Sequence, residues 1–177
     1  MRHYKIAAAS LLLVSAVATA AYAAVRFKEV AIRPTNGNLS TQAAEARALG
    51  ADTQPVHGGL FITFKEVGLG SNDGTNYLVT ADATATYGCI NRGSKHPKAS
   101  NKQTVSGPVS ASATFTSDNN GNVSGAIAIA PLPAGDFSCP PGQSLELISV
   151  SYSNVVLADV TNGISASFPG PYTLSMF

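Results

Sequence analysis

Residues 76–90 read NYLVTADATATYGCI, and in this segment apolar and polar side chains alternate over almost the whole length. Alternation with a period of two residues is the pattern of a β-strand with one buried and one solvated face. The segment therefore predicts a long strand around which the other strands assemble. Its predicted buried row consists of Tyr77, Val79, Ala81, Ala83, Ala85, Tyr87 and Cys89.

Shorter segments of the same kind, separated by turn residues, fill most of the remaining chain. They cover residues 24–32, 60–67, 104–116, a returning strand from Val123, 144–152, 155–161, 164–168 and 172–177, with a bulge expected at Ile148 and Ser149. Most connections are too short for parallel crossovers, so the strands should pair antiparallel. We therefore predict an all-β, antiparallel two-sheet β-sandwich of seven to eight strands, immunoglobulin-like or jelly-roll-like. Because tryptophan is absent, a true immunoglobulin domain is not expected.

The first residues have the composition of an export signal. Arg2 and Lys5 precede an apolar run at 6–20, and Ala21-Tyr22-Ala23 supplies a small-x-small cleavage pattern. This order predicts a secretory signal peptide over 1–23 and a secreted protein without a membrane span after cleavage. The alternative is an uncleaved anchor over 6–25, which at about 20 residues is just long enough to cross a bilayer. The remaining chain is predicted to comprise a strand or arm with a possible short helix over 24–58 and the sandwich over 59–177.

The segment 24–58 carries two further patterns. Residues 39–51 (LSTQAAEARALGA) have two interpretations, a short exposed helix that Ser40 or Thr41 caps and Gly50 ends, or a disordered arm. The tetrapeptide Phe-Lys-Glu-Val occurs at 27–30 and again at 64–67. The repetition has two interpretations, a chance match or two equivalent edge strands.

The charge balance excludes one class of partner. Without Arg2 and Lys5, the 11 basic residues become 9 against 10 acidic residues, a net charge of −1. Nucleic-acid binding depends on an excess of positive charge, so no nucleic-acid partner is expected. Charged residues make up only 12% of the chain, which is typical of exported β-proteins that expose hydroxyls and amides.

The chain has two cysteines, Cys89 and Cys139. In an exported chain they predict one disulfide. The bond would join positions 139 − 89 = 50 residues apart. On the chain-entropy account a loop of this size stabilises the fold by about 4 kcal/mol.

Four segments occur in an order that resembles a known group of proteins. They are Gly68-Leu69-Gly70, the segment 85–93 (ATYGCINRG), the segment 97–102 (PKASNK) and the segment 138–143 (SCPPGQ). This order resembles a group of small, uncharacterised secreted β-sandwich proteins that is common in actinobacteria. The resemblance spans residues 60–161 and implies export, a β fold and a bond between Cys89 and Cys139. It implies no activity.

Metal and cofactor sites are not expected. His57 and His96 lie far apart in sequence, whereas zinc or copper needs several converging ligands. The segment 118–122 (DNNGN) resembles the start of a calcium loop, but Val123 occupies the glycine position and Ile129 the twelfth. A tight turn explains this segment better, and the same holds for residues 72–74.

Catalysis by paired carboxylates would have to draw on a small set of residues. These are Glu66, Asp73, Asp82, Glu146 and Asp159, of which we expect Asp82 and Asp159 on solvated strand faces. No Gly-x-Ser-x-Gly motif accompanies the many hydroxyls. Catalytic residues are therefore not assigned, and a secreted hydrolase whose carboxylates converge only in the fold is the alternative hypothesis.

One loop concentrates positive charge. Its residues are Arg92, Lys95, His96, Lys98 and Lys102. Such a cluster is a candidate site for an anionic ligand, with an anionic envelope polymer or an extracellular protein as partner. A solvated loop that keeps the sandwich soluble is the competing interpretation. The sequence favours a secreted, non-catalytic protein that binds a partner or forms part of a cell surface or matrix.

Overall fold

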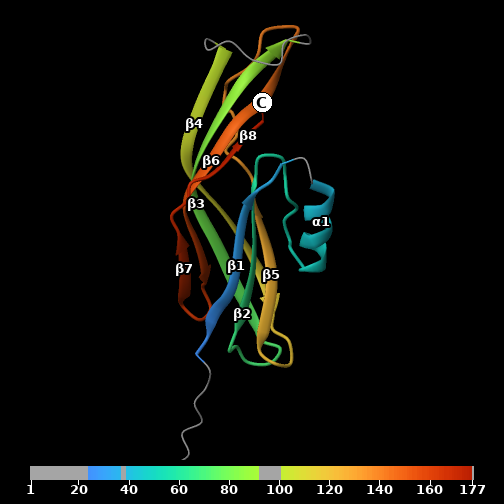
Figure 1. Cartoon of the computed structure of the whole chain (residues 1–177), viewed down its shortest axis with the longest axis vertical. Helices are drawn as coiled ribbons and strands as arrows, with labels where there is room; N and C mark the ends of the chain where they lie inside the picture. Colours follow the sequence, from blue (N-terminus) through green and yellow to red (C-terminus); the bar gives the residue numbers. More distant parts are fainter. Residues whose placement is uncertain (1–23, 37–38, 92–100, 177) are drawn as a thin grey trace, which may run out of the picture.

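The computed structural model describes residues 24–36, 39–91 and 101–176 (Figure 1). In these ranges it contains one short helix and eight strands. The elements are β1 (Arg26–Pro34), α1 (Leu39–Ala48), β2 (Leu60–Val67), β3 (Gly74–Asn91), β4 (Lys102–Thr116), β5 (Asn122–Ile129), β6 (Gln143–Asp159), β7 (Ile164–Phe168) and β8 (Tyr172–Ser175). The predicted signal peptide over 1–23 and most of the basic loop lie outside the described residues.

The strands form two antiparallel sheets that pack face to face. The smaller sheet has the order β1-β2-β5, and the larger has the order β4-β3-β6-β7, with β8 also paired to β6. The prediction of an antiparallel two-sheet β-sandwich of seven to eight strands is therefore confirmed, and the described residues form eight. Figure 1 shows that β3, β4 and β6 extend well past the end of the smaller sheet.

The core lies between the sheets and follows the alternation of β3. Tyr77, Val79, Ala81, Ala83 and Ala85 are buried, as predicted. They pack against the inward row of β2 and β5, which includes Leu60, Ile62, Phe64, Val123 and Ile127. Burial of these apolar side chains drives the two sheets together.

The single long strand β6 covers the two strands that the sequence predicted at 144–152 and 155–161. Its pairing with β3 shifts at Ile148, which confirms the predicted bulge. It shifts again at Asn154, where φ is +51°. This second bulge adds one residue without ending the strand, so the two predicted segments are one element.

The repeated tetrapeptide does not form two equivalent edge strands. The copy in β1 pairs antiparallel with the copy in β2, so that Val30 lies opposite Phe64 and Glu29 opposite Lys65. β1 is an edge strand, whereas β2 is central and its Glu66 is fully buried. The interpretation as equivalent edges is therefore wrong, because the two copies have different neighbours.

The helix α1 covers part of the outer face of the smaller sheet. Its Ala46 packs with Phe61, Ala126 and Ala128 of that sheet. The helix begins at Leu39, so Ser40 and Thr41 lie within its first turn and do not precede it as caps. Gly50 follows the helix with φ +68°, as expected for a residue that ends it.

The predicted disulfide is present. Cys89 at the far end of β3 is bonded to Cys139, with 5.5 Å between their Cα atoms. Cys139 belongs to the proline-rich segment 130–142, which connects β5 to β6. The bond therefore attaches this connection to the part of the larger sheet that extends past the smaller one.

Candidate functional site

Hydroxyl-bearing side chains occupy most of the outward face of the larger sheet, which we call the hydroxyl face. Cross-strand partners share a face of a sheet, and the pairing of five strands joins their outward rows into one surface. All of its members are exposed or half-buried. They are Thr80, Thr84, Thr86, Thr104, Ser106, Ser110, Ser112, Thr114, Thr116, Ser144, Ser149, Ser151, Ser153, Ser165, Ser167, Thr173 and Ser175.

Several of these hydroxyls are held by neighbours on the next strand. Thr84 pairs with Ser106 at 3.0 Å and Thr86 with Thr104 at 3.1 Å. On the same face, between β6 and β8, Ser151 pairs with Thr173 at 3.3 Å. A hydroxyl both donates and accepts, so each one keeps hydrogen-bonding capacity toward a ligand after it has paired.

Charge is sparse on this face. In the part of the chain that the structure describes, the outward rows of the larger sheet carry only Asp82, Glu146 and Lys102 as charged residues. Asp82 accepts a hydrogen bond from Asn154 Nδ2 at 2.8 Å. Lys102 and Glu146 lie on either side of Gly88, near the end of the sheet that extends past the smaller one.

The structure places one member of the predicted basic cluster. Lys102 is the first residue of β4 and is exposed on the outward face. Arg92, Lys95, His96 and Lys98 lie outside the described residues. In sequence they lie between the end of β3 and the start of β4. The predicted anionic-ligand site stays a prediction.

Two hollows adjoin the hydroxyl face. One, of about 380 Å³, is lined by Asn76, Ser112 and Thr114 together with Asp52 from the loop after α1. The other, of about 240 Å³, is lined by residues of β6 and β7 that include Ser167. Ligand pockets typically measure about 300–1,000 Å³, so the first hollow is at the lower end of that range and the second is below it.

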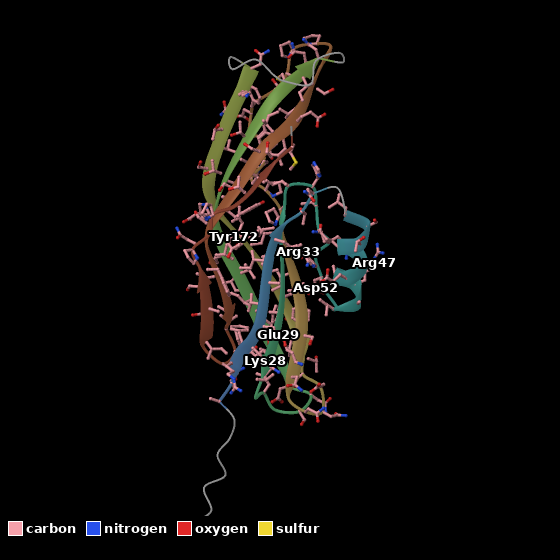
Figure 2. All side chains as sticks on the ribbon, viewed as in Figure 1. Lys28, Glu29, Arg33, Arg47, Asp52 and Tyr172 are labelled. Atoms are coloured by element: carbon pink, nitrogen blue, oxygen red, sulfur yellow. A yellow bond between two sulfur atoms is a disulfide. The ribbon has the colours of Figure 1, made fainter. Side chains whose placement is uncertain are left out.

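A larger groove of about 660 Å³ lies between α1 and the outer face of β1 and β2. Lys28 and Lys65 line it together with Glu29 and Glu45. Figure 2 shows Lys28 and Glu29 on β1 and Arg33 on the side of the same strand that faces α1. Arg33 forms an ion pair with Glu45, and its guanidinium lies 5.2 Å from the centre of the Phe61 ring. Charges of both signs around the groove do not favour an ionic ligand of either sign.

Two carboxyl groups lie in the interior between the sheets. Glu66 of β2 is fully buried and accepts a hydrogen bond from Tyr77 Oη at 2.5 Å. Asp159 of β6 is also buried, and its Oδ1 accepts from the backbone N–H groups of Thr161 and Asn162, both at 2.9 Å. Burial raises the pKa of Glu66 to about 7, and the negative charge of Asp159 acts in the same direction.

The prediction that Asp159 lies on a solvated face is wrong, whereas Asp82 is exposed as predicted. The bulge at Asn154 adds one residue to β6, so that Val155, Leu157 and Asp159 face inward. The sequence does contain a signal for the burial of Glu66, because Glu66 continues the period-two row of Leu60, Ile62 and Phe64. No sequence signal marks Glu66 and Asp159 as neighbours.

The candidate carboxylates on the strands lie in two different places. Glu66 and Asp159 are enclosed in the core, and Asp82 and Glu146 lie on the outward face of the larger sheet. None of the three hollows described above is lined by two of these four residues. The hydrolase alternative stays a prediction.

The turn at Asp118 is held by its own side chain. Asp118 Oδ1 accepts from the backbone N–H groups of Asn120 at 2.8 Å and Asn122 at 2.9 Å. These donors lower the pKa of Asp118 and hold the chain in a tight turn. His57 is exposed, and within the described ranges no three His, Cys, Asp or Glu side chains converge as metal ligands.

No family model matches the chain, and it matches no curated protein and no solved structure. The resemblance to secreted actinobacterial proteins therefore stays a prediction. Within the ranges that the structure describes, no helix is long and apolar enough to cross a membrane.

Proposed function

We propose that this protein is an exported, non-catalytic binding module of a cell surface or matrix. Its partner is a polyhydroxylated envelope polymer that carries anionic groups. The observation that carries this proposal is the hydroxyl face, a charge-poor surface shared by five strands with Lys102 at one end.

The chemistry of the hydroxyl face suits a polysaccharide. Sugar hydroxyls donate and accept hydrogen bonds, and so do the serine and threonine side chains that face them. The cross-strand pairs Thr84–Ser106 and Thr86–Thr104 hold four of these hydroxyls in defined positions. Such ordering reduces the entropy that is lost on binding.

The basic residues supply the contact with anionic groups. Lys102 is the first residue of β4. Arg92, Lys95 and Lys98 precede it in the sequence, between β3 and β4. Lysine and arginine are strong donors to phosphate and carboxylate. An interaction of exposed charges of this kind weakens as the ionic strength rises.

Export is supported by two features. Residues 1–23 have the composition of a signal peptide. The Cys89–Cys139 disulfide is compatible with an oxidising compartment outside the cytoplasm.

A retention assay on insoluble envelope polysaccharide tests the role of the hydroxyl face. The triple variant Thr84→Val, Thr86→Val and Thr104→Val removes three exposed hydroxyls and keeps the β-branched shape. At about 1 kcal/mol for each hydrogen bond, we expect retention to weaken by at least about tenfold. The matched control is Thr63→Val on the outer face of the smaller sheet, which should leave retention unchanged. Equal retention of the wild type, the triple variant and the control would show that the hydroxyl face is not the binding surface.

The basic residues are tested in the same assay with Arg92→Ala, Lys95→Ala and Lys98→Ala combined. We expect weaker retention on the anionic polymer and a smaller dependence on salt than in the wild type. Unchanged retention would exclude the basic residues and leave a neutral polysaccharide as the partner. Release of soluble sugar during the assay would favour the hydrolase instead.

A further inference from the structure

The interior carboxyl groups lie where three strands of both sheets meet. Glu66 belongs to β2 of the smaller sheet, and Tyr77 and Asp159 belong to β3 and β6 of the larger sheet. All three are buried. The hydrogen bond from Tyr77 to Glu66 therefore joins the two sheets through the core.

The surroundings of Glu66 are apolar and aromatic. The Phe64 ring lies 4.6 Å from the Tyr77 ring and 5.6 Å from the Phe115 ring, measured between centroids. Phe27 of β1 closes the cluster, with its centroid 6.0 Å from that of Phe64. A carboxylate in such surroundings loses most of its hydration, which disfavours the ionised form.

No positive charge in the described residues compensates Glu66. The elements packed around it present Phe27 from β1, Val123 from β5, Phe115 from β4, Thr75 and Tyr77 from β3, and Asp159 from β6. Arg26, Lys28 and Glu29 of β1 are exposed, and Lys65 lies on the opposite face of β2. The one charged group that faces Glu66 is thus another carboxylate.

A hydrogen bond between Glu66 and Asp159 requires a proton on one of the two carboxyl groups. Glu66 Oε1 is buried and has no donor among the described residues. Asp159 already accepts hydrogen bonds from Thr161 N, Asn162 N and Asn162 Nδ2. Two ionised carboxylates cannot hydrogen-bond to each other, whereas a protonated Glu66 can donate to Asp159 and still accept from Tyr77.

We propose that Glu66, Tyr77 and Asp159 form a pH-sensitive latch between the two sheets. With Glu66 protonated, the three side chains form a continuous hydrogen-bonded connection. When Glu66 loses its proton, two like charges share the core, and the end of the sandwich around the β6–β7 turn loosens.

The direction of the pH dependence follows from the raised pKa of Glu66. The unfolded chain releases this proton near the ordinary pKa of 4.5, and the folded protein releases it only near pH 7. Between these values the folded state binds more protons than the unfolded state, so stability falls as the pH rises. The contribution of the protonated carboxyl is thus fully present below pH 4.5 and is lost once the pH passes 7.

The first test compares the thermal unfolding midpoint of the wild type and of Glu66→Gln from pH 4.5 to 8. Glutamine keeps an acceptor for Tyr77 and a donor toward Asp159 but does not titrate. We expect the wild-type midpoint to fall over this range by several degrees more than that of the variant. The matched control is Asp82→Asn, which changes an exposed carboxyl of the same sheet and should keep the wild-type profile. Parallel profiles of wild type and Glu66→Gln would overturn the proposal.

The second test uses the folded wild type, so it does not depend on whether the variant folds. Carbon-13 NMR follows the side-chain carboxyls as the pH is raised, and hydrogen exchange follows the amides of Thr161 and Asn162. We expect one carboxyl to titrate near pH 7 and these amides to exchange faster over the same interval. A Glu66 signal that titrates near its ordinary pKa would overturn the proposal, as would exchange that shows no change at the β6–β7 turn.

Discussion

At the scale of single residues, three tyrosines of the larger sheet donate hydrogen bonds to β2 and to two loops. Besides the bond from Tyr77 to Glu66, Tyr152 Oη donates to Gly58 O at 2.8 Å and Tyr87 Oη donates to Leu132 O at 2.6 Å. Each ring adds apolar contact, and each hydroxyl finds an acceptor despite its burial. Burial raises the pKa of Tyr87 and Tyr152, so both hydroxyls stay protonated donors over the physiological range.

The variant Tyr152→Phe tests the contribution of one of these bonds. The change leaves the Gly58 carbonyl without its side-chain donor, and we expect the free energy of unfolding to fall by about 1 kcal/mol. Urea denaturation measures the difference. Tyr172→Phe is the control, because Tyr172 is half-buried and its hydroxyl has no partner among the described residues. Equal effects of the two substitutions would contradict a specific role for the Tyr152 hydroxyl.

At the scale of elements, β5 approaches the aromatic cluster through a glycine. A Cβ atom on Gly125 would lie 2.7 Å from the Phe64 ring and 3.0 Å from the Phe115 ring. Gly125 also lies opposite Phe64 in the pairing of β2 with β5. The absence of a side chain at this position therefore lets the two phenylalanine rings meet between the sheets.

We expect Gly125→Ala to destabilise the fold by about 1–3 kcal/mol, because the added methyl group must displace one of the rings. The control is Gly107→Ala in β4, where the nearest atom to an added Cβ is Leu132 Cδ1 at 3.8 Å. Chemical denaturation of both variants checks the prediction. If Gly125→Ala were as stable as Gly107→Ala, the close packing of β5 against these rings would be contradicted.

At the scale of the whole molecule, the two sheets differ in length. The larger sheet continues past the smaller one, and there the segment 130–142 is attached to β3. The attachment consists of the hydrogen bond from Tyr87 to Leu132 O and the Cys89–Cys139 bond. A disulfide and the hydroxyl of the half-buried Tyr87 thus hold this end of the larger sheet, which the smaller sheet does not reach.

Replacement of both cysteines by alanine tests this attachment. A native disulfide of this kind typically contributes about 2–5 kcal/mol. We expect a loss of that size in urea denaturation, with faster hydrogen exchange in the segment 130–142 than near Tyr77. Reduction of the wild type is the control and should reproduce the loss. A double variant as stable as the oxidised wild type would show that the bond is dispensable for the fold.

The sequence alone determined the features that depend on neighbours along the chain. Alternation identified the buried row of β3, and the turn residues separated most of the strands. The bulge at Ile148 was readable as a break in the alternation. The disulfide was predictable because the chain offers a single pair of cysteines.

Only the tertiary structure decided which strands are neighbours and which side chains meet. The hydroxyl rows of single strands were readable, but their union into one face depends on the order β4-β3-β6-β7. The bulge at Asn154 reverses the alternation of β6 and brings Asp159 into the core beside Glu66. The physical reason is that a period of two residues specifies the faces of one strand, whereas the partner across the core is set by how two sheets pack.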